Sequence, residues 1–261
     1  MPASAAPRAV TGAEYVKQLT ALESDRRARA AFQAIVLSIA PPGGALFDFG
    51  SGTGMDARLY AERGHTVAAY DVDPQMREFF GAHCRDLIEA GRVTLHCGDY
   101  RNFLAEDDVG GFRGIDVVTS NFAPLNLIDN LQELFAKFHA LTSPCGQVLA
   151  SVLNPYYVGD LRYRWWWWNL PRLCRDGHFS VQGVQAPIVR RRLAEFAAQS
   201  APYFALTRVF RGLPPSRARD AAGVDVSAGV ALAGLRLTSC RYIFLLFEKR
   251  SLGTVTRQGN K

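Results

Sequence analysis

The stretch FDFGSGTGMDARLY, residues 47–60, constrains the fold of this chain more than any other part of its sequence. An apolar run ends in three alternating glycines, Gly50, Gly52 and Gly54, and a helix-forming segment follows at once. Glycine permits a tight turn between a strand and a helix, and it lets the backbone approach a ligand closely. The pattern therefore predicts a strand, a ligand-binding turn and a helix in succession.

The alternation of apolar runs and helical patterns continues along the first 153 residues. Strands are expected over 45–49, 66–71, 92–97, 115–120 and 147–153, and helices over 13–40, 53–63, 74–90 and 127–141. Further on, a helix is expected over 186–201 and strands over 203–210 and 241–248, whereas residues 212–236 fit no element. Strands that alternate with helices indicate an α/β fold, a doubly wound parallel sheet with helices on both faces.

The length of 261 residues suits one large domain. We expect the Pro/Ala-rich residues 1–12 to be disordered and residues 13–261 to form a single domain. No apolar run reaches the roughly 18 residues of a membrane span, and the N-terminal residues lack the apolar core of a secretory signal. These features predict a cytoplasmic protein.

Cysteine spacing and charge distribution also bear on function. The five cysteines form no C-x-x-C pair, so no metal site is expected. Residues 1–150 carry 13 basic and 18 acidic side chains, whereas residues 151–261 carry 17 and 6. The two halves are therefore expected to have different roles.

Two carboxylates accompany the glycine turn and indicate its ligand. Asp71 ends the second expected strand, where a carboxylate can accept hydrogen bonds from both hydroxyls of a ribose. A dinucleotide-binding turn, G-x-G-x-x-G, would require glycine where Met55 stands. Asp48, just before the turn, would repel a pyrophosphate but attract a positively charged amine. A nicotinamide dinucleotide is thus disfavoured.

The sequence D-F-G-S-G-T-G resembles motif I of the class I S-adenosylmethionine-dependent methyltransferases, and Y-D-V-D-P-Q-M resembles their second motif. The second motif often has serine where Pro74 stands, and proline starts a helix equally well. The resemblance covers residues 13–155 and, more loosely, the rest. It implies a Rossmann-like sheet of seven strands, mostly parallel with the last strand antiparallel, and transfer of a methyl group (EC 2.1.1) from S-adenosyl-L-methionine.

The resemblance also implies which residues bind the cofactor. Those expected at its methionine part are Asp48, Gly50, Ser51, Gly52 and Gly54; at the ribose, Asp71; at the adenine, Val72, Met76, Asp99 and Tyr100; and near the transferable methyl group, Asn121 and Phe122. Tyr15 is a further cofactor-binding candidate, on the N-terminal helix that is expected at the acceptor site. For Asp99 a second interpretation stays open, since it can instead cap the helix that follows. Asp73 is interpreted as such a cap.

The segment after residue 154 is expected to form a substrate lid. Trp165–Trp168 cannot all face one core, because neighbours on a helix point about 100° apart. Trp165, Trp166, Arg162 and Arg164 are the substrate-binding candidates. There are three alternatives for this segment. The tryptophans can pack on the sheet with the arginines solvated, the segment can form a lid over an apolar or aromatic substrate, or it can contact a membrane surface. The run Arg190–Arg192 is expected on a solvated helical face, and a site for an acidic substrate is the alternative.

Candidates for a catalytic base are weaker. His178, Tyr156, Tyr157 and Asn126 are the residues considered. The segment N-F-A-P-L-N after the fourth strand lacks the N/D-P-P-Y/F signature that resembles N6-adenine and glutamine methyltransferases. It is more similar to the small-molecule branch of the family.

The leading hypothesis is therefore methyl transfer to a small-molecule or lipid-like acceptor, with residues 13–155 holding the cofactor and residues 156–261 covering the acceptor. An RNA methyltransferase is one alternative, because phosphate binding needs basic residues. The sequence has no separate RNA-binding module, however, and its excess of arginine over lysine fits a GC-rich genome equally well. A cofactor-binding scaffold without catalysis is the other alternative. The oligomeric state is left open.

Overall fold

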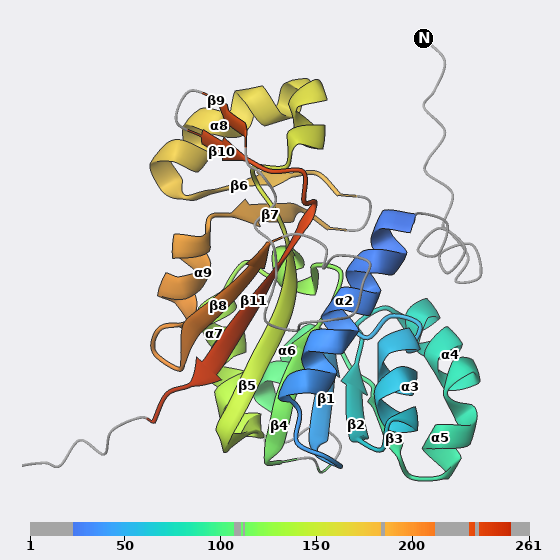
Figure 1. The fold of residues 1–261 in the computed structure, drawn as a ribbon. Coiled ribbons are helices and arrows are strands. Elements are labelled where there is room, and N and C mark those ends of the chain that lie inside the picture. Colours follow the sequence, from blue (N-terminus) through green and yellow to red (C-terminus); the bar gives the residue numbers. More distant parts are fainter. Residues whose placement is uncertain are drawn as a thin grey trace, which may run out of the picture.

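A sheet of seven strands forms the centre of the molecule in the computed structural model (Figure 1). The structure describes residues 23–251 apart from 107–110, 112, 184–185, 212–229 and 233–234. The segment expected to be disordered, 1–12, and the candidate Tyr15 lie outside the described residues, as does most of the unassigned segment 212–236.

The strand order in the sheet is β3-β2-β1-β4-β5-β11-β8. The strands are β1 (Ala45–Phe49), β2 (Thr66–Tyr70), β3 (Val93–His96), β4 (Ile115–Ser120), β5 (Thr142–Leu153), β8 (Phe204–Arg211) and β11 (Tyr242–Lys249). All pairings from β3 to β5 are parallel, and β11 is antiparallel to both of its neighbours, β5 and β8. The predicted fold class is confirmed, including the antiparallel last strand.

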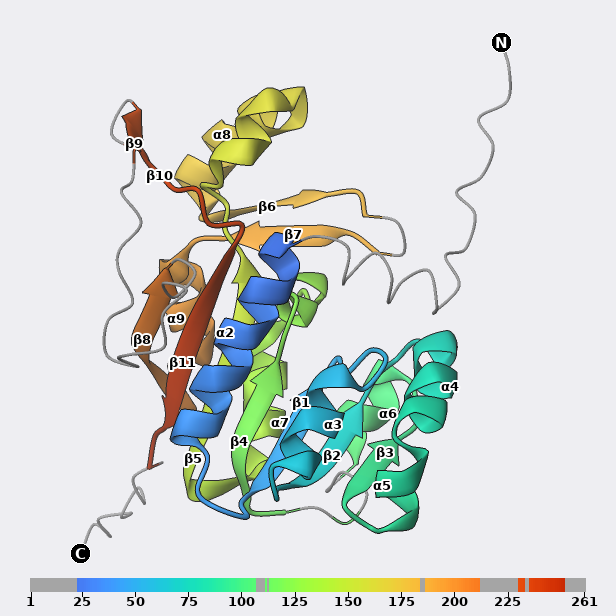
Figure 2. The ribbon, with the colours of Figure 1, turned by 45° about the vertical axis from the view of Figure 1, so that its right-hand side comes forward.

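Helices cover both faces of the sheet (Figure 2). One face carries α2 (Glu23–Ile39), α3 (Met55–Glu62), α4 (Pro74–His83) and α5 (Arg85–Glu89), and the other carries α6 (Tyr100–Ala105), α7 (Leu131–Leu141) and α9 (Leu193–Ser200). The alternation along β1 explains the two cores. Leu46 packs in the cluster under α2 and α3, whereas Phe47 and Phe49 pack in the cluster under α6 and α7.

Several predicted boundaries differ from the structure. The expected helix 74–90 is divided at Cys84, and the expected helix 127–141 begins only at Leu131, after the 3-10 helix η1 (Pro124–Leu127). β5 begins at Thr142, five residues before the expected strand 147–153, and its pairing with β4 shifts register near Ile115. Residues 143–146, Ser-Pro-Cys-Gly, have a composition typical of turns, and the irregular pairing with β4 allows them to lie within the strand.

A separate unit between β5 and α9 lies beyond the carboxyl ends of the parallel strands (Figures 1 and 2). It contains the 3-10 helix η2 (Val158–Arg162), α8 (Arg164–Asp176) and the hairpin of β6 (His178–Val181) with β7 (Ile188–Arg191). The short antiparallel pair of β9 (Val230–Leu232) and β10 (Leu235–Leu237) precedes β11 in the chain. Among the residues described, no helix combines the length and apolar composition of a membrane span.

Asn126, one of the four candidates for a catalytic base, connects this unit to the sheet. Its side chain is fully buried; Nδ2 donates to the carbonyl of Val189 in β7 at 2.6 Å, and Oδ1 accepts from the Leu153 N–H of β5 at 3.0 Å. Both ends of the amide are therefore engaged in holding β7 against the end of β5.

Replacing Asn126 with alanine should lower the free energy of unfolding by about 1–3 kcal/mol, because it leaves a buried N–H and a buried carbonyl without partners. Urea denaturation measures the loss. The matched control is Asn102→Ala, at an exposed position, which should change the value by less than about 0.5 kcal/mol. Equal midpoints for the two variants would contradict the connecting role of Asn126.

Candidate functional site

The turn between β1 and α3 has the conformation that its glycines permit. Gly50, Gly52 and Gly54 have φ angles of 74°, 55° and 81°, in the left-handed region. A Cβ atom on Gly50 would lie 2.4 Å from the ring of Pro124, and one on Gly54 would lie 2.8 Å from the Cys84 sulfur. The predicted turn thus forms as expected, and at both places its neighbours leave no room for a side chain.

The turn is fastened to the end of β2 by the backbone and by Asp71. The carbonyl of Tyr70 accepts hydrogen bonds from the N–H groups of Gly50 and Ser51. The Asp71 carboxylate accepts from the Gly52 N–H at 2.7 Å and from the Asp73 N–H at 2.9 Å. Burial raises the pKa of Asp71, and these two N–H groups oppose the rise. A carboxylate has lone pairs for further donors, so two hydroxyl groups can still be accommodated.

Asp48 is buried beneath the turn at the end of β1 and is 2% exposed. Its Oδ1 accepts from the Thr119 hydroxyl at 3.0 Å, and its Oδ2 is buried without a hydrogen-bond partner. Burial, with the negative charge of Asp56 as the second cause, raises the pKa of Asp48 to about 8. An unpartnered carboxylate oxygen in this position suits a positively charged ligand group.

Asp56, at the start of α3, forms a polar network with two other elements. Arg29 of α2 makes an ion pair with it at 2.7 Å, and Gln33 of α2 donates to it at 2.6 Å. Asn121, after β4, donates to the second carboxylate oxygen at 3.0 Å. Sequence reasoning missed Arg29, Gln33 and Asp56, because their contacts join distant segments; an acid in the first turn of a helix was the available signal.

The segment after β4 has an unusual backbone. Phe122 and Ala123 have φ angles of 59° and 71°, which non-glycine residues seldom adopt. The Phe122 ring meets the Tyr242 ring edge-on at 5.3 Å, and the Arg29 guanidinium lies 4.6 Å from the Phe122 centroid. Strained backbone of this kind is concentrated at functional sites. The predicted candidates Asn121 and Phe122 thus lie at the carboxyl end of β4, beside the Asp56 network.

On the far side of Asp71, the predicted adenine-binding residues have different surroundings. Val72 is 55% exposed and Met76 is half-buried. Asp99 caps α6, because its Oδ1 accepts from the Asn102 N–H at 2.8 Å, and Asp73 caps α4 through the Gln75 N–H. The capping interpretation is confirmed for both aspartates. Capping uses one oxygen of Asp99, and the other remains available.

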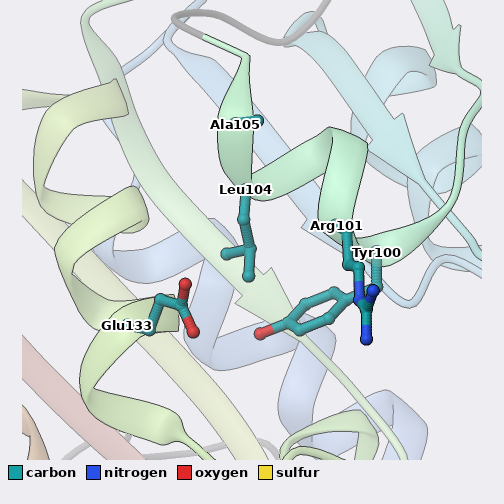
Figure 3. A pocket seen from close by; sticks show the side chains of 5 residues that line it. All are labelled: Tyr100, Arg101, Leu104, Ala105 and Glu133. Carbon is teal, nitrogen blue, oxygen red and sulfur yellow. The ribbon is translucent and has the colours of Figure 1, made fainter.

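Tyr100 lies on the α6–α7 face of the sheet, opposite the face of Asp48. Its ring packs 6.4 Å from that of Phe49, and its side chain lines a surface pocket of about 460 Å³ together with Arg101, Leu104, Ala105 and Glu133 (Figure 3). Burial, together with the charge of Glu133, raises the pKa of the Tyr100 hydroxyl. Tyr100 thus lies across the sheet from Asp48, and its expected contact with the adenine stays a prediction.

The prediction for the arginine run was wrong in both structure and burial. Arg190 and Arg191 belong to strand β7, and their side chains are 8% and 3% exposed. Arg190 pairs with Asp160 at 3.2 Å, donates to the Asn154 carbonyl at 3.1 Å and lies 5.8 Å from the Trp165 centroid. Both arginines lie in the β6–β7 hairpin, on which neighbouring elements pack. Their polar partners offset the cost of burying two charges.

Arg191 fastens the segment after β4 to the hairpin. Its guanidinium donates to the carbonyls of Leu125, Ile128 and Asp129 at 3.3, 2.6 and 3.0 Å. The unit between β5 and α9 is therefore attached to the same segment that contains the strained Phe122.

The four tryptophans divide between the interior and the surface, as the helical spacing predicted. Trp166 is 1% exposed and donates to the Pro155 carbonyl at 2.9 Å, and Trp165 is half-buried against Phe179. Trp167 and Trp168 are 47% and 71% exposed. The other two substrate candidates, Arg162 and Arg164, are exposed and lie over the rings of Tyr163 and Trp168 respectively.

The remaining candidates for a base do not converge. His178 is exposed on β6, with Nδ1 4.0 Å from a Glu195 oxygen. Tyr156 and Tyr157 are half-buried at the end of β5, and the Tyr157 ring lies against Gly159. In the described part of the chain, no group of three or more His, Cys, Asp or Glu residues is arranged to hold a metal.

The chain is similar to known proteins both in sequence and in fold. A sequence model described as "Methyltransferase domain" matches residues 19–186. No curated protein matches the chain. A TehB-like S-adenosylmethionine-dependent methyltransferase of Corynebacterium glutamicum superposes with a TM-score of 0.54 at 14% identity, over 92% of this chain and 98% of that one.

Two further structures are similar to comparable extents. The 1,6-didemethyltoxoflavin-N1-methyltransferase of Burkholderia thailandensis, solved with 1,6-didemethyltoxoflavin and S-adenosylhomocysteine, gives a TM-score of 0.58 at 17% identity, over 93% of this chain and 88% of that one. The pyocyanin biosynthetic protein PhzM superposes with a TM-score of 0.56 at 16% sequence identity, over 92% of this chain and 58% of that one. At these identities the likeness shows a shared fold.

The glycine turn can be tested by a matched pair of substitutions. Gly52→Ala meets no atom within 4 Å, so it should cost only about 1–2 kcal/mol for the left-handed conformation. Gly54→Ala adds contacts with Cys84 and Phe80 and should cost about 1–3 kcal/mol more. Chemical denaturation followed by circular dichroism measures both. Equal losses would contradict the packing of Gly54 against α4.

Proposed function

The chain belongs to the class I S-adenosylmethionine-dependent methyltransferases, and we propose that it methylates a small-molecule or lipid-like acceptor. It is an enzyme of class EC 2.1.1, and its cofactor is S-adenosyl-L-methionine. The match to the methyltransferase family model is the observation that supports this activity. The proposal concerns the acceptor and the roles of individual residues.

We propose that the cofactor is held by the turn Gly50–Gly54 and by the carboxylates on either side of it. The unpartnered Oδ2 of Asp48 fits the amine of the methionine part, and Asp71 fits the ribose hydroxyls. The exposed Val72 supports an adenine contact at the end of β2. S-Adenosylmethionine supplies a methyl group on a positively charged sulfur. The protein therefore needs mainly to align the acceptor and exclude water.

The acceptor site is proposed at the carboxyl ends of β4 and β5, under the unit that contains α8. Aromatic rings of Phe122, Tyr242 and Trp165 are present there, and Arg241 lies over the Tyr242 ring at 5.5 Å. Burial raises the pKa of Asp160, and Arg190, Arg241 and Arg162 oppose that rise. The aromatic rings, one of them under the Arg241 guanidinium, favour an acceptor with an aromatic group.

Two observations favour a small acceptor over RNA. Arg190 and Arg191, part of the basic C-terminal half, are buried and bound within the chain, so they are not available to phosphates. The similar Burkholderia enzyme was solved with a bound 1,6-didemethyltoxoflavin. Residues 23–155 are proposed to hold the cofactor and residues 156–251 to cover the acceptor. His178, Tyr156 and Tyr157 remain candidates for a base.

Calorimetric titration with S-adenosylmethionine, S-adenosylhomocysteine and NAD tests the cofactor site. We expect micromolar binding of both adenosyl compounds and none of NAD. Methylation of small aromatic and acidic compounds, followed with radiolabelled cofactor, then tests the acceptor against an RNA pool. Binding without transfer to any compound or extract would favour the scaffold alternative, and transfer to RNA would overturn the small-acceptor proposal.

Replacing Asp71 with asparagine should weaken binding of S-adenosylhomocysteine by about 1–3 kcal/mol, because a neutral amide accepts the ribose hydroxyls less strongly. The asparagine oxygen can keep accepting from the Gly52 N–H, while its NH2 group replaces the oxygen that faces the Asp73 N–H. Calorimetry measures affinity, and the matched control is Asp73→Asn, which removes a neighbouring charge and keeps a capping oxygen for α4. Equal affinities for wild type and Asp71→Asn would sink the ribose assignment.

Cofactor binding should release protons through Asp48. With a pKa of about 8, this carboxyl is mostly protonated at pH 6.5–7, and a cationic amine beside it favours the charged form. Binding must therefore lower that pKa and release up to one proton. The affinity for the cofactor should rise between about pH 6 and 7.5, because less free energy is then needed to deprotonate Asp48.

Titrations in two buffers with different ionisation enthalpies measure this release. Asp48→Asn should abolish it, whereas Asp86→Asn, an exposed control, should not. A proton release that persists in Asp48→Asn would show that another group titrates.

A further inference from the structure

One face of α8 points away from the rest of the molecule and is unusual in composition. Its members are Arg164, Trp167, Trp168, Pro171, Arg172 and Arg175, called here the α8 outer face. Their spacing of three, four, seven, eight and eleven residues places them on one stripe of a helix. All six are exposed, and no acidic residue belongs to the stripe.

The opposite side of the same helix fixes it to the protein. Trp166 and Leu173 are 1% and 0% exposed, and the Trp166 indole donates to the Pro155 carbonyl at 2.9 Å. The Trp167 indole N–H donates to the Leu161 carbonyl at 2.8 Å. Trp167 is thus held outside by its own hydrogen bond, with its apolar ring still exposed. The helix cannot turn these rings inward without losing its anchors.

Charge on the α8 outer face is positive. The Arg164 guanidinium lies 5.3 Å from the Trp168 centroid, and Arg175 pairs with the neighbouring Asp176 at 2.7 Å. No ion pair within the described residues neutralises Arg164 or Arg172. Tryptophan rings with arginines around them are the composition of protein surfaces at a lipid–water boundary.

We infer that the α8 outer face docks on a membrane surface that contains anionic lipid, with Trp167 and Trp168 in the headgroup region and Arg164 and Arg172 on the lipid phosphates. In Figure 1 α8 lies at the end of the molecule beyond the carboxyl ends of the parallel strands. Docking there would turn the proposed acceptor side toward the bilayer. This binding goes beyond methyl transfer and does not depend on the identity of the acceptor.

Nucleic acid fits the same face less well. Successive bases stack on rings whose faces are free and roughly parallel. Trp165 and Trp166 are not on this face, and the Arg164 guanidinium lies over one face of the Trp168 ring, so few free ring faces are left for stacking. A second copy of the chain would bring arginines against arginines, which repel.

The position of the tryptophans makes the test direct. All four tryptophans of the chain lie in this helix, so intrinsic fluorescence reports on α8 alone. We expect the full chain to sediment with vesicles of phosphatidylcholine and phosphatidylglycerol, with a blue shift of its emission. It should bind vesicles of phosphatidylcholine alone at least about tenfold more weakly, because each arginine near an anionic surface contributes about a fivefold gain.

Matched variants locate the contact. The double substitution Trp167→Ala/Trp168→Ala should lower vesicle binding by roughly tenfold or more, and Arg164→Gln/Arg172→Gln by about tenfold or more. Leu127→Ala is the control for apolar exposure, since Leu127 is 48% exposed, and Arg63→Gln is the control for charge. Both controls should bind as wild type does.

Binding of S-adenosylhomocysteine should be unchanged in all of these variants, which separates this inference from the proposed function. Three results would overturn the inference: no sedimentation with anionic vesicles, unchanged sedimentation of the tryptophan variant, or binding of an RNA oligonucleotide that both α8 variants lose while vesicle binding persists.

Discussion

The carboxylate of Asp56 is the point at which three separate parts of the chain meet. It accepts from Arg29 and Gln33 of α2 and from Asn121 at the end of β4, while its own helix begins just after the glycine turn. A buried charge is tolerated only when it is paired, and this one is. Because Asp56 engages the nearby arginine, Asp48 is left with an unpartnered oxygen. The free carboxylate oxygen beneath the glycine turn is thus associated with the pairing of Arg29 with Asp56 rather than with Asp48.

Local sequence determined the parts of the fold that could be predicted. The strands 45–49 and 115–120 were predicted to the residue, because each is a short run rich in apolar and β-branched residues that follows a turn with glycine. Gly50, Gly54 and Asp71 could be identified because their roles depend on backbone conformation and on residues a few positions away along neighbouring strands. The break at Cys84 had no such signal, since alanine, histidine and arginine around it all favour a helix.

The rest of the site depends on contacts between segments that are distant in sequence. Three consecutive arginines read as a solvated face, and only the β6–β7 hairpin reveals that Arg190 and Arg191 are internal. Arg191 then fixes the carbonyls that follow β4, next to the left-handed Phe122 and Ala123. The strained loop after β4 and the unit between β5 and α9 share this guanidinium, so we expect a displacement of one to move the other.

The place of β11 in the sheet has a consequence for synthesis of the chain. Within the described residues β8 pairs with the sheet only through β11, which follows it in the sequence and is therefore synthesised after it. The strands from β1 to β5 pair with one another from residue 45 to residue 153, and so they can assemble early. The edge of β5 and the whole of β8 must wait for residues 242–249. During that interval the nascent chain presents unpaired strand edges, which are the surfaces that chaperones protect.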